Sequence, residues 1–244
     1  MKNLYMACRA LYESAFPGSS KAWDDALFRH VMPQYLRVIR EGEKPLSMLF
    51  SIPYPIQTEK GCLEARYLYA VATDPAYQGR GLAKQLLGEV ASEGYPVFLR
   101  PSSEGLFSFY QKAGFSPMSP MLTEVGTATP GDVTAFRHLS VEEYLRARTA
   151  FLPLPHAEPT PAFLSLGFSL GGAVALENEF VAFYERRGDL VWFKEWLGKR
   201  EFAPRAAAFL GAAQYKLRTP DKGGAPFGVG IGVPRELAFS IALD

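Results

Sequence analysis

The chain has 244 residues, of which 26 are basic and 25 acidic, and the two signs are well mixed along the sequence. This balance excludes the basic stripe that holds a nucleic acid backbone, so nucleic acid is not an expected partner. Hydrophobic residues make up 48% of the chain, enough to bury the core of one large domain or of two small ones. The sequence shows neither a long apolar span nor a signal peptide, which predicts a cytoplasmic protein that does not enter the membrane.

The first third of the chain predicts two helices followed by an antiparallel sheet. One apolar helical face contains Leu4, Cys8, Leu11 and Ala15, and Phe16-Pro17-Gly18 ends that helix. Residues 35–40 and 46–52 predict a hairpin. A third strand is expected to include Glu64 and to end at Thr73.

A strand, helix, strand unit follows. Residues 82–90 predict a helix, residues 97–99 a short strand, and a further helix begins near residues 101–103 and ends at Gly114, where glycine can adopt the left-handed conformation. The two strands of such a unit are expected to pair in parallel. The fold class expected is therefore α+β, with a mixed, mainly antiparallel sheet flanked by helices.

Between residues 116 and 134 the composition shifts to Pro, Met, Ser, Thr and Gly, which is typical of a linker. We therefore expect two domains, 1–125 and 126–244. The second contains a helix from Val141 capped by Ser140, strands at 180–185, 190–197, near 215 and at 237–243, and a helix at 203–213. This order is similar to the first half, so a degenerate second copy stays open. The apolar hairpin 180–196 also offers a pairing surface for a homo-oligomer.

Cysteine and histidine are sparse. Cys8 and Cys62 lie far apart without metal-ligand spacing, and only His30, His138 and His156 could join them. We expect no metal site and two buried thiols in a reducing compartment.

Gln78-Gly79-Arg80-Gly81-Leu82-Ala83 lies between the strand that ends at Thr73 and the next helix. Backbone N–H groups at a helix start are unsatisfied and glycines let an anion approach closely, so a pyrophosphate would fit. A dinucleotide fingerprint is excluded because Lys84 occupies the third glycine position and the preceding strands are antiparallel. A Walker loop is excluded because no Gly-Lys-Ser/Thr follows.

Together, the strand 69–73, this loop and the segment Phe109-Tyr110-Gln111-Lys112-Ala113-Gly114-Phe115 resemble the GNAT-type N-acetyltransferases. The resemblance covers about residues 35–115. It is closest to bacterial members with an additional C-terminal domain, because Pro226-Phe227-Gly228 and residues 237–244 resemble their ending. It implies acetyl-CoA as co-substrate and an amine of a small molecule or peptide as acceptor.

The resemblance also implies roles for individual residues. It places the main chain of Val71, Ala72 and Thr73 against the pantetheine arm, as an added strand would lie. It assigns the pyrophosphate to Gln78, Gly79, Arg80, Gly81, Leu82, Ala83 and Lys84, although the side chains of Arg80 and Lys84 are also explained as solvated surface charge.

Tyr110 occupies the position of the family's general acid, which protonates the leaving thiolate; the alternative is a core aromatic. The base is poorly marked, because Tyr67 stands where some members carry a carboxylate. Glu64, His30, an ordered water and the terminal carboxylate of Asp244 remain candidates.

The sequence thus predicts an N-acetyltransferase that works by direct transfer in a ternary complex, with a second domain that shapes the acceptor site. A non-catalytic protein that binds or senses acyl-CoA is the alternative. Aromatic residues expected at the cleft favour a small or amphipathic acceptor, namely Tyr35, Phe50, Tyr67 and Tyr69. The segment Gly167-Phe168-Ser169-Leu170-Gly171 matches a hydrolase nucleophile elbow, but no histidine follows Ser169, so we interpret it as a helix end with a glycine turn.

Overall fold

The computed structural model describes residues 2–18, 21–30 and 32–241, and the chain divides into two compact units. The first unit comprises Met1–Pro55, Glu64–Ser116 and Val229–Val233, and the second comprises Ile56–Leu63, Pro117–Gly228 and Pro234–Asp244. The units are therefore not two consecutive stretches, and the expected boundary at residue 125 falls inside a strand, β7 (Ser116–Thr127). Within the described ranges, no helix is long and apolar enough to cross a bilayer.

The first unit is built on a mixed sheet. Its strands follow the order β1 (Leu36–Glu41), β2 (Lys44–Pro53), β5 (Arg66–Thr73), β6 (Val97–Leu99) and the last residues of β14 (Ala225–Ile231). The pairs β1–β2, β2–β5 and β6–β14 are antiparallel, whereas β5–β6 is parallel. The α+β class and the parallel pairing across the helical crossover are thus confirmed.

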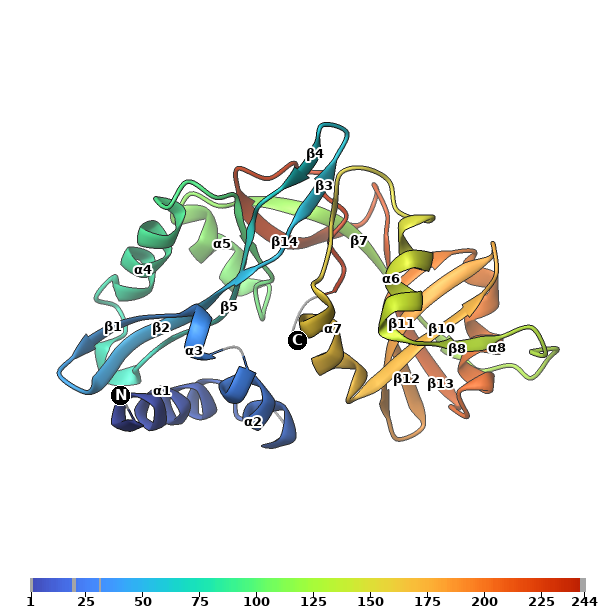
Figure 1. Cartoon of the computed structure of the whole chain (residues 1–244), viewed down its shortest axis with the longest axis horizontal. Coiled ribbons are helices and arrows are strands. Elements are labelled where there is room, and N and C mark those ends of the chain that lie inside the picture. Colours follow the sequence, from blue (N-terminus) through green and yellow to red (C-terminus); the bar gives the residue numbers. More distant parts are fainter. Residues whose placement is uncertain (1, 19–20, 31, 242–244) are drawn as a thin grey trace. The chain divides into compact units, whose positions relative to one another are not determined.

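Helices cover both faces of this sheet (Figure 1). One face carries α1 (Lys2–Ala15) and α2 (Lys21–His30), and the other carries α4 (Leu82–Ala91) and α5 (Gly105–Lys112). Neighbouring strand residues point to opposite faces. Leu68 accordingly packs in the α4–α5 core, whereas Tyr67 and Tyr69 belong to the aromatic core under α1 and α2. A short helix, α3 (Met32–Tyr35), leads directly into β1.

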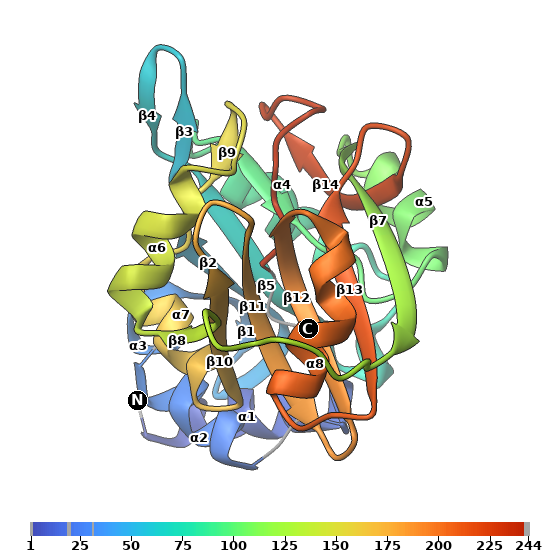
Figure 2. The same cartoon turned by 90° about the vertical axis from the view of Figure 1, so that its right-hand side faces the viewer.

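The second unit contains a larger sheet. Its strands after β14 follow the order β7, β13 (Gln214–Pro220), β12 (Leu190–Gly198), β11 (Phe180–Arg187), β10 (Gly171–Leu176) and β8 (Arg137–Leu139). Ala182 and Tyr184 pack with α8 (Ala203–Phe209), which lies in front of β12 and β13 in Figure 2. Phe183 points to the opposite face, where it contacts Tyr144 of α6 (Val141–Thr149) and Phe168 of α7 (Pro161–Phe168). A small sheet joins β4 (Gly61–Leu63), β3 (Ile56–Thr58) and β9 (His156–Ala157).

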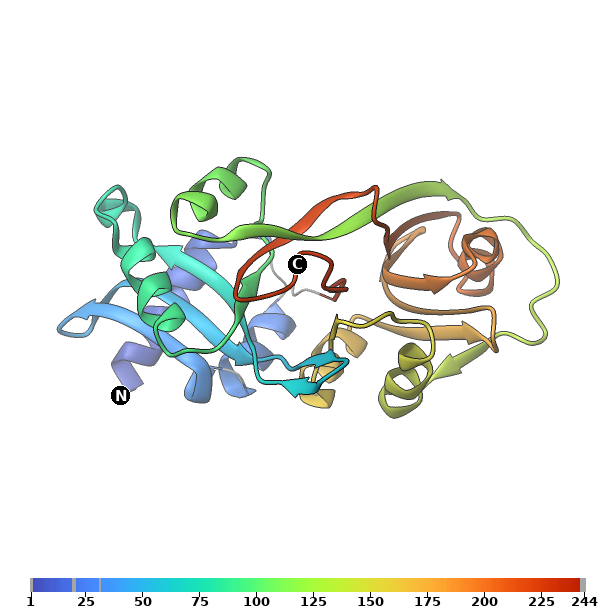
Figure 3. The same ribbon diagram turned by 90° about the horizontal axis from the view of Figure 1, so that it is seen from above.

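Several elements differ from the expectation. The segment with linker-like composition is mostly β7, a long continuous strand in Figure 3, because residues 121–127 pair along the whole of β13. Backbone pairing of this kind is independent of side-chain composition. Residues 237–241 form no regular strand, and 242–244 lie outside the described residues. Strands β8, β10 and β14 were not expected, and Glu64 lies between β4 and β5 rather than within a strand.

The two cysteines lie in different environments. Cys8 is buried in α1, as expected, and burial raises the pKa of its thiol to about 11. Cys62 is exposed in β4, so the expectation of two buried thiols is wrong. All three residues of β4 are exposed because this strand is the edge of a three-stranded sheet.

Candidate active site

A tight turn connects β5 to α4. Asp74 accepts a hydrogen bond from the Ala76 N–H (2.9 Å) and opens the 3-10 turn η1 (Pro75–Tyr77). Gly79 and Gly81 then adopt left-handed backbone conformations, with φ of 76° and 79°, and α4 begins at Leu82. This conformation is readily available only to glycine, which is why the sequence carries glycine at both positions.

The start of α4 has the features of an anion site. Gly81 is the N-cap and offers no side chain to the N–H groups of the first turn. A Cβ atom added to Gly79 or Gly81 would meet no atom within 4 Å, so the space outside the loop is open. Unsatisfied N–H groups and the positive end of the helix dipole together favour a phosphate there. The structure therefore brings the predicted residues Gln78–Lys84 together in one exposed turn.

Charged side chains surround this turn. The Arg80 guanidinium lies over the Tyr77 ring (4.7 Å) and donates to the Ala76 carbonyl (3.4 Å). The Lys44 ammonium contacts the other charged group of the turn, Asp74 (3.2 Å), and lies over the same ring. The hydrogen bond that Lys44 donates to Asp74 raises the pKa of Lys44, and the bonds that Asp74 accepts from the Ala76 N–H and Lys44 lower the pKa of Asp74. Arg80 is therefore held at the loop, whereas Lys84 is exposed.

Strand β5 offers a free backbone edge beside this turn. It pairs with β6 only through Arg66 and Tyr67. The Asp74 N–H donates to Leu46 on the β2 side (2.9 Å). Because backbone groups alternate along a strand, the N–H groups of Val71 and Thr73 point away from β2, toward the side where the described chain supplies no strand partner. The predicted residues Val71–Thr73 thus form an edge that can accept an extended ligand as an added strand.

A β-bulge interrupts β5 just before this edge. Ala70 has a φ of 54°, in the left-handed region, and the pairing register with β2 shifts between Met48 and Phe50. A left-handed alanine costs roughly 1–2 kcal/mol, and such strain is concentrated at functional sites. No sequence signal identified this bulge, because alanine is not a residue that favours it.

Tyr110 lies near the end of α5, inside the core formed with α4. Its side chain is 6% exposed, and its ring packs edge-on against Phe115 (5.8 Å). The Phe115 N–H donates to the Tyr110 carbonyl (3.0 Å), while Gly114 takes the left-handed conformation predicted for it (φ 91°). Burial raises the pKa of Tyr110 to about 12, so the phenol keeps its proton at neutral pH. Among the described residues, the Tyr110 hydroxyl has no hydrogen-bond partner, which leaves it available as a donor.

Of the candidate bases, Glu64 is not brought to this site. Glu64 is exposed just before β5 begins, and at about 3.3 Å per residue of extended chain it lies up to roughly 23 Å from Val71. Tyr67 is 1% exposed and Phe50 fully buried, so neither forms the exposed cleft surface that was expected. The side chain of His30 and all of Asp244 lie outside the described residues. The structure adds Asp24 of α2, a carboxylate that is 5% exposed and whose Oδ1 has no hydrogen-bond partner in the described chain.

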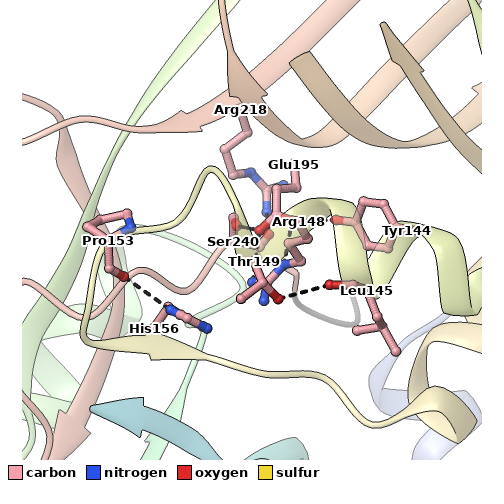
Figure 4. A network of polar contacts seen from close by, with 9 residues as sticks. All are labelled: Tyr144, Leu145, Arg148, Thr149, Pro153, His156, Glu195, Arg218 and Ser240. Carbon is pink, nitrogen blue, oxygen red and sulfur yellow. Dashed lines mark hydrogen bonds and ion pairs between the residues drawn. The ribbon is translucent and has the colours of Figure 1, made fainter. Parts of the chain in front are cut away.

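A buried polar network lies in the second unit (Figure 4). Glu195 of β12 is fully buried and pairs with Arg148 of α6 through the Nε–Oε2 (2.7 Å) and Nη2–Oε1 (3.1 Å) contacts. The Tyr144 and Ser240 hydroxyls also donate to Glu195, and Arg218 donates to the Ser240 carbonyl (3.0 Å). The sequence analysis missed this network, because its members are spread over almost 100 residues and share no motif.

His156 lies beside the network. It donates from Nδ1 to the Pro153 carbonyl (3.1 Å), and burial lowers its pKa, so the ring is neutral at pH 7. Ser169 follows α7 in an exposed glycine turn, which confirms a helix end rather than a nucleophile elbow.

Comparison with known proteins identifies the segment that contains the loop, the bulge and Tyr110. Residues 3–118 match the model of the acetyltransferase (GNAT) domain. They form a GNAT acetyltransferase domain. The resemblance noted in the sequence is thereby confirmed for this segment of the chain.

Solved structures share the fold of this chain beyond the matched segment. A GCN5-related N-acetyltransferase from Anabaena variabilis is 14% identical with a TM-score of 0.68, over 94% of this chain and 70% of that chain. Another from Kribbella flavida is 12% identical with a TM-score of 0.65, over 94% of this chain and 67% of that chain. This likeness extends into the second unit and shows its fold only. The sequence has no significant match among curated proteins.

Proposed function

We propose that this GNAT protein transfers an acetyl group from acetyl-CoA to a primary amine of a small molecule or peptide, within a ternary complex. The observation that carries the proposal is the continuity of two ligand surfaces. The free edge of β5 at Val71–Thr73 leads within one turn into the open, glycine-lined start of α4. An extended arm that ends in a pyrophosphate matches both surfaces at once.

In this arrangement the pantetheine arm lies along Val71–Thr73 and the pyrophosphate lies on the N–H groups of residues 79–84. The Val71 N–H, beside the bulge at Ala70, is placed to donate to the thioester carbonyl and to stabilise the charge that develops on its oxygen. Holding donor and acceptor together removes the entropic part of the barrier.

The reaction forms an N–C bond and breaks the C–S bond of the thioester. The amine loses one proton to water, and the departing thiolate takes one from Tyr110, which regains its proton from solvent. With a pKa of about 12, Tyr110 is a weaker acid than a thiol, whose pKa is about 8.5. The phenol therefore acts first as a hydrogen-bond donor to the charge on sulfur, and proton transfer follows as the thiolate leaves the site.

One observation favours a second function. Glu64, the one predicted base whose side chain the structure describes, lies far from the free edge of β5. A protein that binds acyl-CoA and senses it without turnover would need no base.

Replacing Tyr110 with phenylalanine separates the two functions. We expect acetyl-CoA to raise the melting temperature of wild type and Tyr110→Phe alike, because a ligand at 100 times its Kd contributes about 2.7 kcal/mol. We expect CoA release with an amine panel to fall about 100-fold in the variant, since general acids contribute at least that factor.

Tyr95→Phe is the matched control, because it removes a phenol whose ring lies against Arg66 rather than in the α5 core. Equal rates in wild type and Tyr110→Phe would refute the role of Tyr110. Stabilisation by acetyl-CoA without transfer to any amine would favour the sensor.

A further inference from the structure

Two tyrosine hydroxyls meet on the α1 face of the sheet in the first unit. The Oη atoms of Tyr12 and Tyr69 are 3.2 Å apart. Tyr12 is fully buried in α1, whereas Tyr69 is half-buried in β5. Tyr69 is therefore the member of the pair that a ligand can reach.

The Tyr69 ring is held in a fixed orientation. It is stacked between Phe50 (6.4 Å, 24°) and Tyr67 (6.3 Å, 21°), both buried. Such packing fixes the rotamer, so the hydroxyl is positioned before any ligand arrives.

Tyr69 is also adjacent to the interruption in β5. It pairs with Phe50 as the last residue before Ala70, whose left-handed conformation marks the bulge. The strand edge beyond the bulge is where the acetyl-CoA arm is proposed to lie. The Tyr69 side chain thus projects from the residue next to the proposed thioester site.

Tyr69 and Tyr110 lie on opposite faces of the sheet. Leu68 packs in the same core as Tyr110, under α4 and α5, and the next residue along the strand must point the other way. The face that carries Tyr110 is assigned to the departing sulfur. The face that carries Tyr69 is therefore left for the incoming amine.

The pair has the chemistry to receive an amine. A phenol that donates its proton to a second hydroxyl still has oxygen lone pairs that accept a hydrogen bond. Phe50 and Tyr67 are buried, so the accessible surface here is the exposed part of the Tyr69 side chain, whose ring offers apolar area next to the hydroxyl and favours an amine on an apolar body. A polycation would be held less well here because, of the two carboxylates of α2, Asp25 is already bound to Arg9 (2.7 Å) and Asp24 is buried.

We propose that Tyr69 accepts a hydrogen bond from the attacking nitrogen, that Tyr12 positions its hydroxyl, and that the preferred acceptor is a primary amine carried on an apolar or aromatic body. This inference rests on the proposed acetyl transfer. During the reaction the nitrogen forms its bond to the carbonyl carbon as the C–S bond breaks, and the amine proton passes to water.

Three conservative variants of the full chain test the proposal. Tyr69→Phe and Tyr12→Phe each remove one hydroxyl and keep the ring. Tyr5→Phe is the matched control, because Tyr5 lies on the same helix as Tyr12 and packs edge-on against Phe28 (5.8 Å) without contacting Tyr69. The measurements are the acetyl-CoA thermal shift and the steady-state kinetics with phenethylamine, hexylamine, spermidine and glycine as amines.

We expect Tyr69→Phe to lower kcat/KM for phenethylamine and hexylamine about tenfold, the effect of one hydrogen bond. Tyr12→Phe is expected to lower it about threefold, and Tyr5→Phe to leave it unchanged. KM for acetyl-CoA and the acetyl-CoA thermal shift should be the same in wild type and in the three variants. If the hydroxyls had only a structural role, their removal would change these two quantities as well. Wild type should prefer the two apolar amines to spermidine and glycine.

An unchanged kcat/KM in Tyr69→Phe, or a preference of wild type for spermidine, would overturn the inference while leaving acetyl transfer intact. A wild type that binds no acetyl-CoA or acetylates no amine would instead refute the proposed function. The two failures are therefore distinguished by the wild-type protein alone.

Discussion

Gly79 and Gly81 show how single residues prepare the candidate site. Both have positive φ, both face open space, and neither supplies a side chain that competes with a ligand. A few residues earlier, Ala70 takes the same left-handed region without the freedom of glycine. At the residue scale, the site consists of backbone conformations more than of charged side chains.

Gly81→Ala should therefore affect both stability and ligand binding. Alanine at a φ of 79° costs about 1–2 kcal/mol, and its methyl group would occupy the open space in which we propose the phosphate lies. We expect a lower melting temperature and at least a tenfold loss of acetyl-CoA affinity, measured by thermal-shift titration.

Gly88→Ala in the same helix is the matched control. Gly88 has no positive φ, and an added Cβ atom would meet no neighbour within 4 Å. Alanine there should stabilise the helix by up to about 1 kcal/mol and leave acetyl-CoA affinity unchanged. Equal affinity losses in the two variants would contradict a specific role for Gly81.

At the scale of secondary structure elements, the Glu195 network joins α6 and β12 to residues 237–241. Arg148 comes from α6, Glu195 from β12 and Ser240 from the segment without regular structure. That segment also bonds to β7, where the Ser119 hydroxyl donates to the Phe239 carbonyl (2.7 Å) and accepts from the Phe239 N–H (3.1 Å). Side-chain bonds thus add to the backbone bonds between Ala238 and residues 155–157 in holding a segment without regular structure.

The network predicts a pH-dependent contribution to stability. Burial alone would raise the pKa of Glu195, but Arg148, Ser240 and Tyr144 together hold it below its ordinary value of 4.5. A depressed carboxyl pKa stabilises the folded state above the unfolded pKa, and this stabilisation is lost as the pH falls through the folded value. Urea unfolding of the wild type should accordingly show a loss of stability below about pH 4.5 that Glu195→Gln lacks.

At pH 7, Glu195→Gln should lower the free energy of unfolding by about 3–5 kcal/mol, because Arg148 keeps its charge in a buried site without its counter-ion. The double variant Arg148→Met/Glu195→Leu should recover most of this loss. Glu142→Gln, at an exposed position of α6, serves as the control and should change stability by less than about 0.5 kcal/mol. If the changes in the free energy of unfolding from the two substitutions simply added up in the double variant, Arg148 and Glu195 would not be coupled.

At the scale of the whole molecule, the two units exchange segments of chain. Ile56–Leu63 belongs to the second unit, although its neighbours on both sides belong to the first. Conversely, Val229–Val233 belongs to the first unit, where Val229–Ile231 pairs with all three residues of β6. Neither unit is complete in one continuous stretch.

A chain cut at the expected boundary should therefore fold poorly. Residues 1–125 lack the β14 partner of β6 and the β13 partner of β7, so two strands are left with unpaired edges. We expect this fragment to aggregate or to unfold at a lower temperature than the full chain. Co-expression with residues 126–244 should restore solubility, and a fragment as stable as the full chain would contradict the exchange of segments.

Much of the site was predictable because it depends on neighbouring residues. The turn at Gly79–Gly81, the helix start at Leu82 and the left-handed Gly114 follow from local backbone preferences, and the structure contains all three. The environment of Tyr110 was not predictable, because its burial and raised pKa arise from residues of different elements, among them Leu68 of β5, Leu86 of α4 and Leu99 of β6. The position of Glu64 was not predictable either. It depends on where β4 ends and where β5 begins, and these ends place Glu64 far from the loop.

The sequence by itself determined the α+β class and the glycine turn before α4, because periodicity and glycine positions act over a few residues, and its motifs carried the resemblance to the acetyltransferase family that the match of residues 3–118 confirms. Only the tertiary structure decided where β5 bulges, which edge of it stays open, that Tyr12 meets Tyr69 and that Glu195 is buried against Arg148. These features arise between residues far apart in the chain, and their free energies depend on packing and burial that no local pattern encodes.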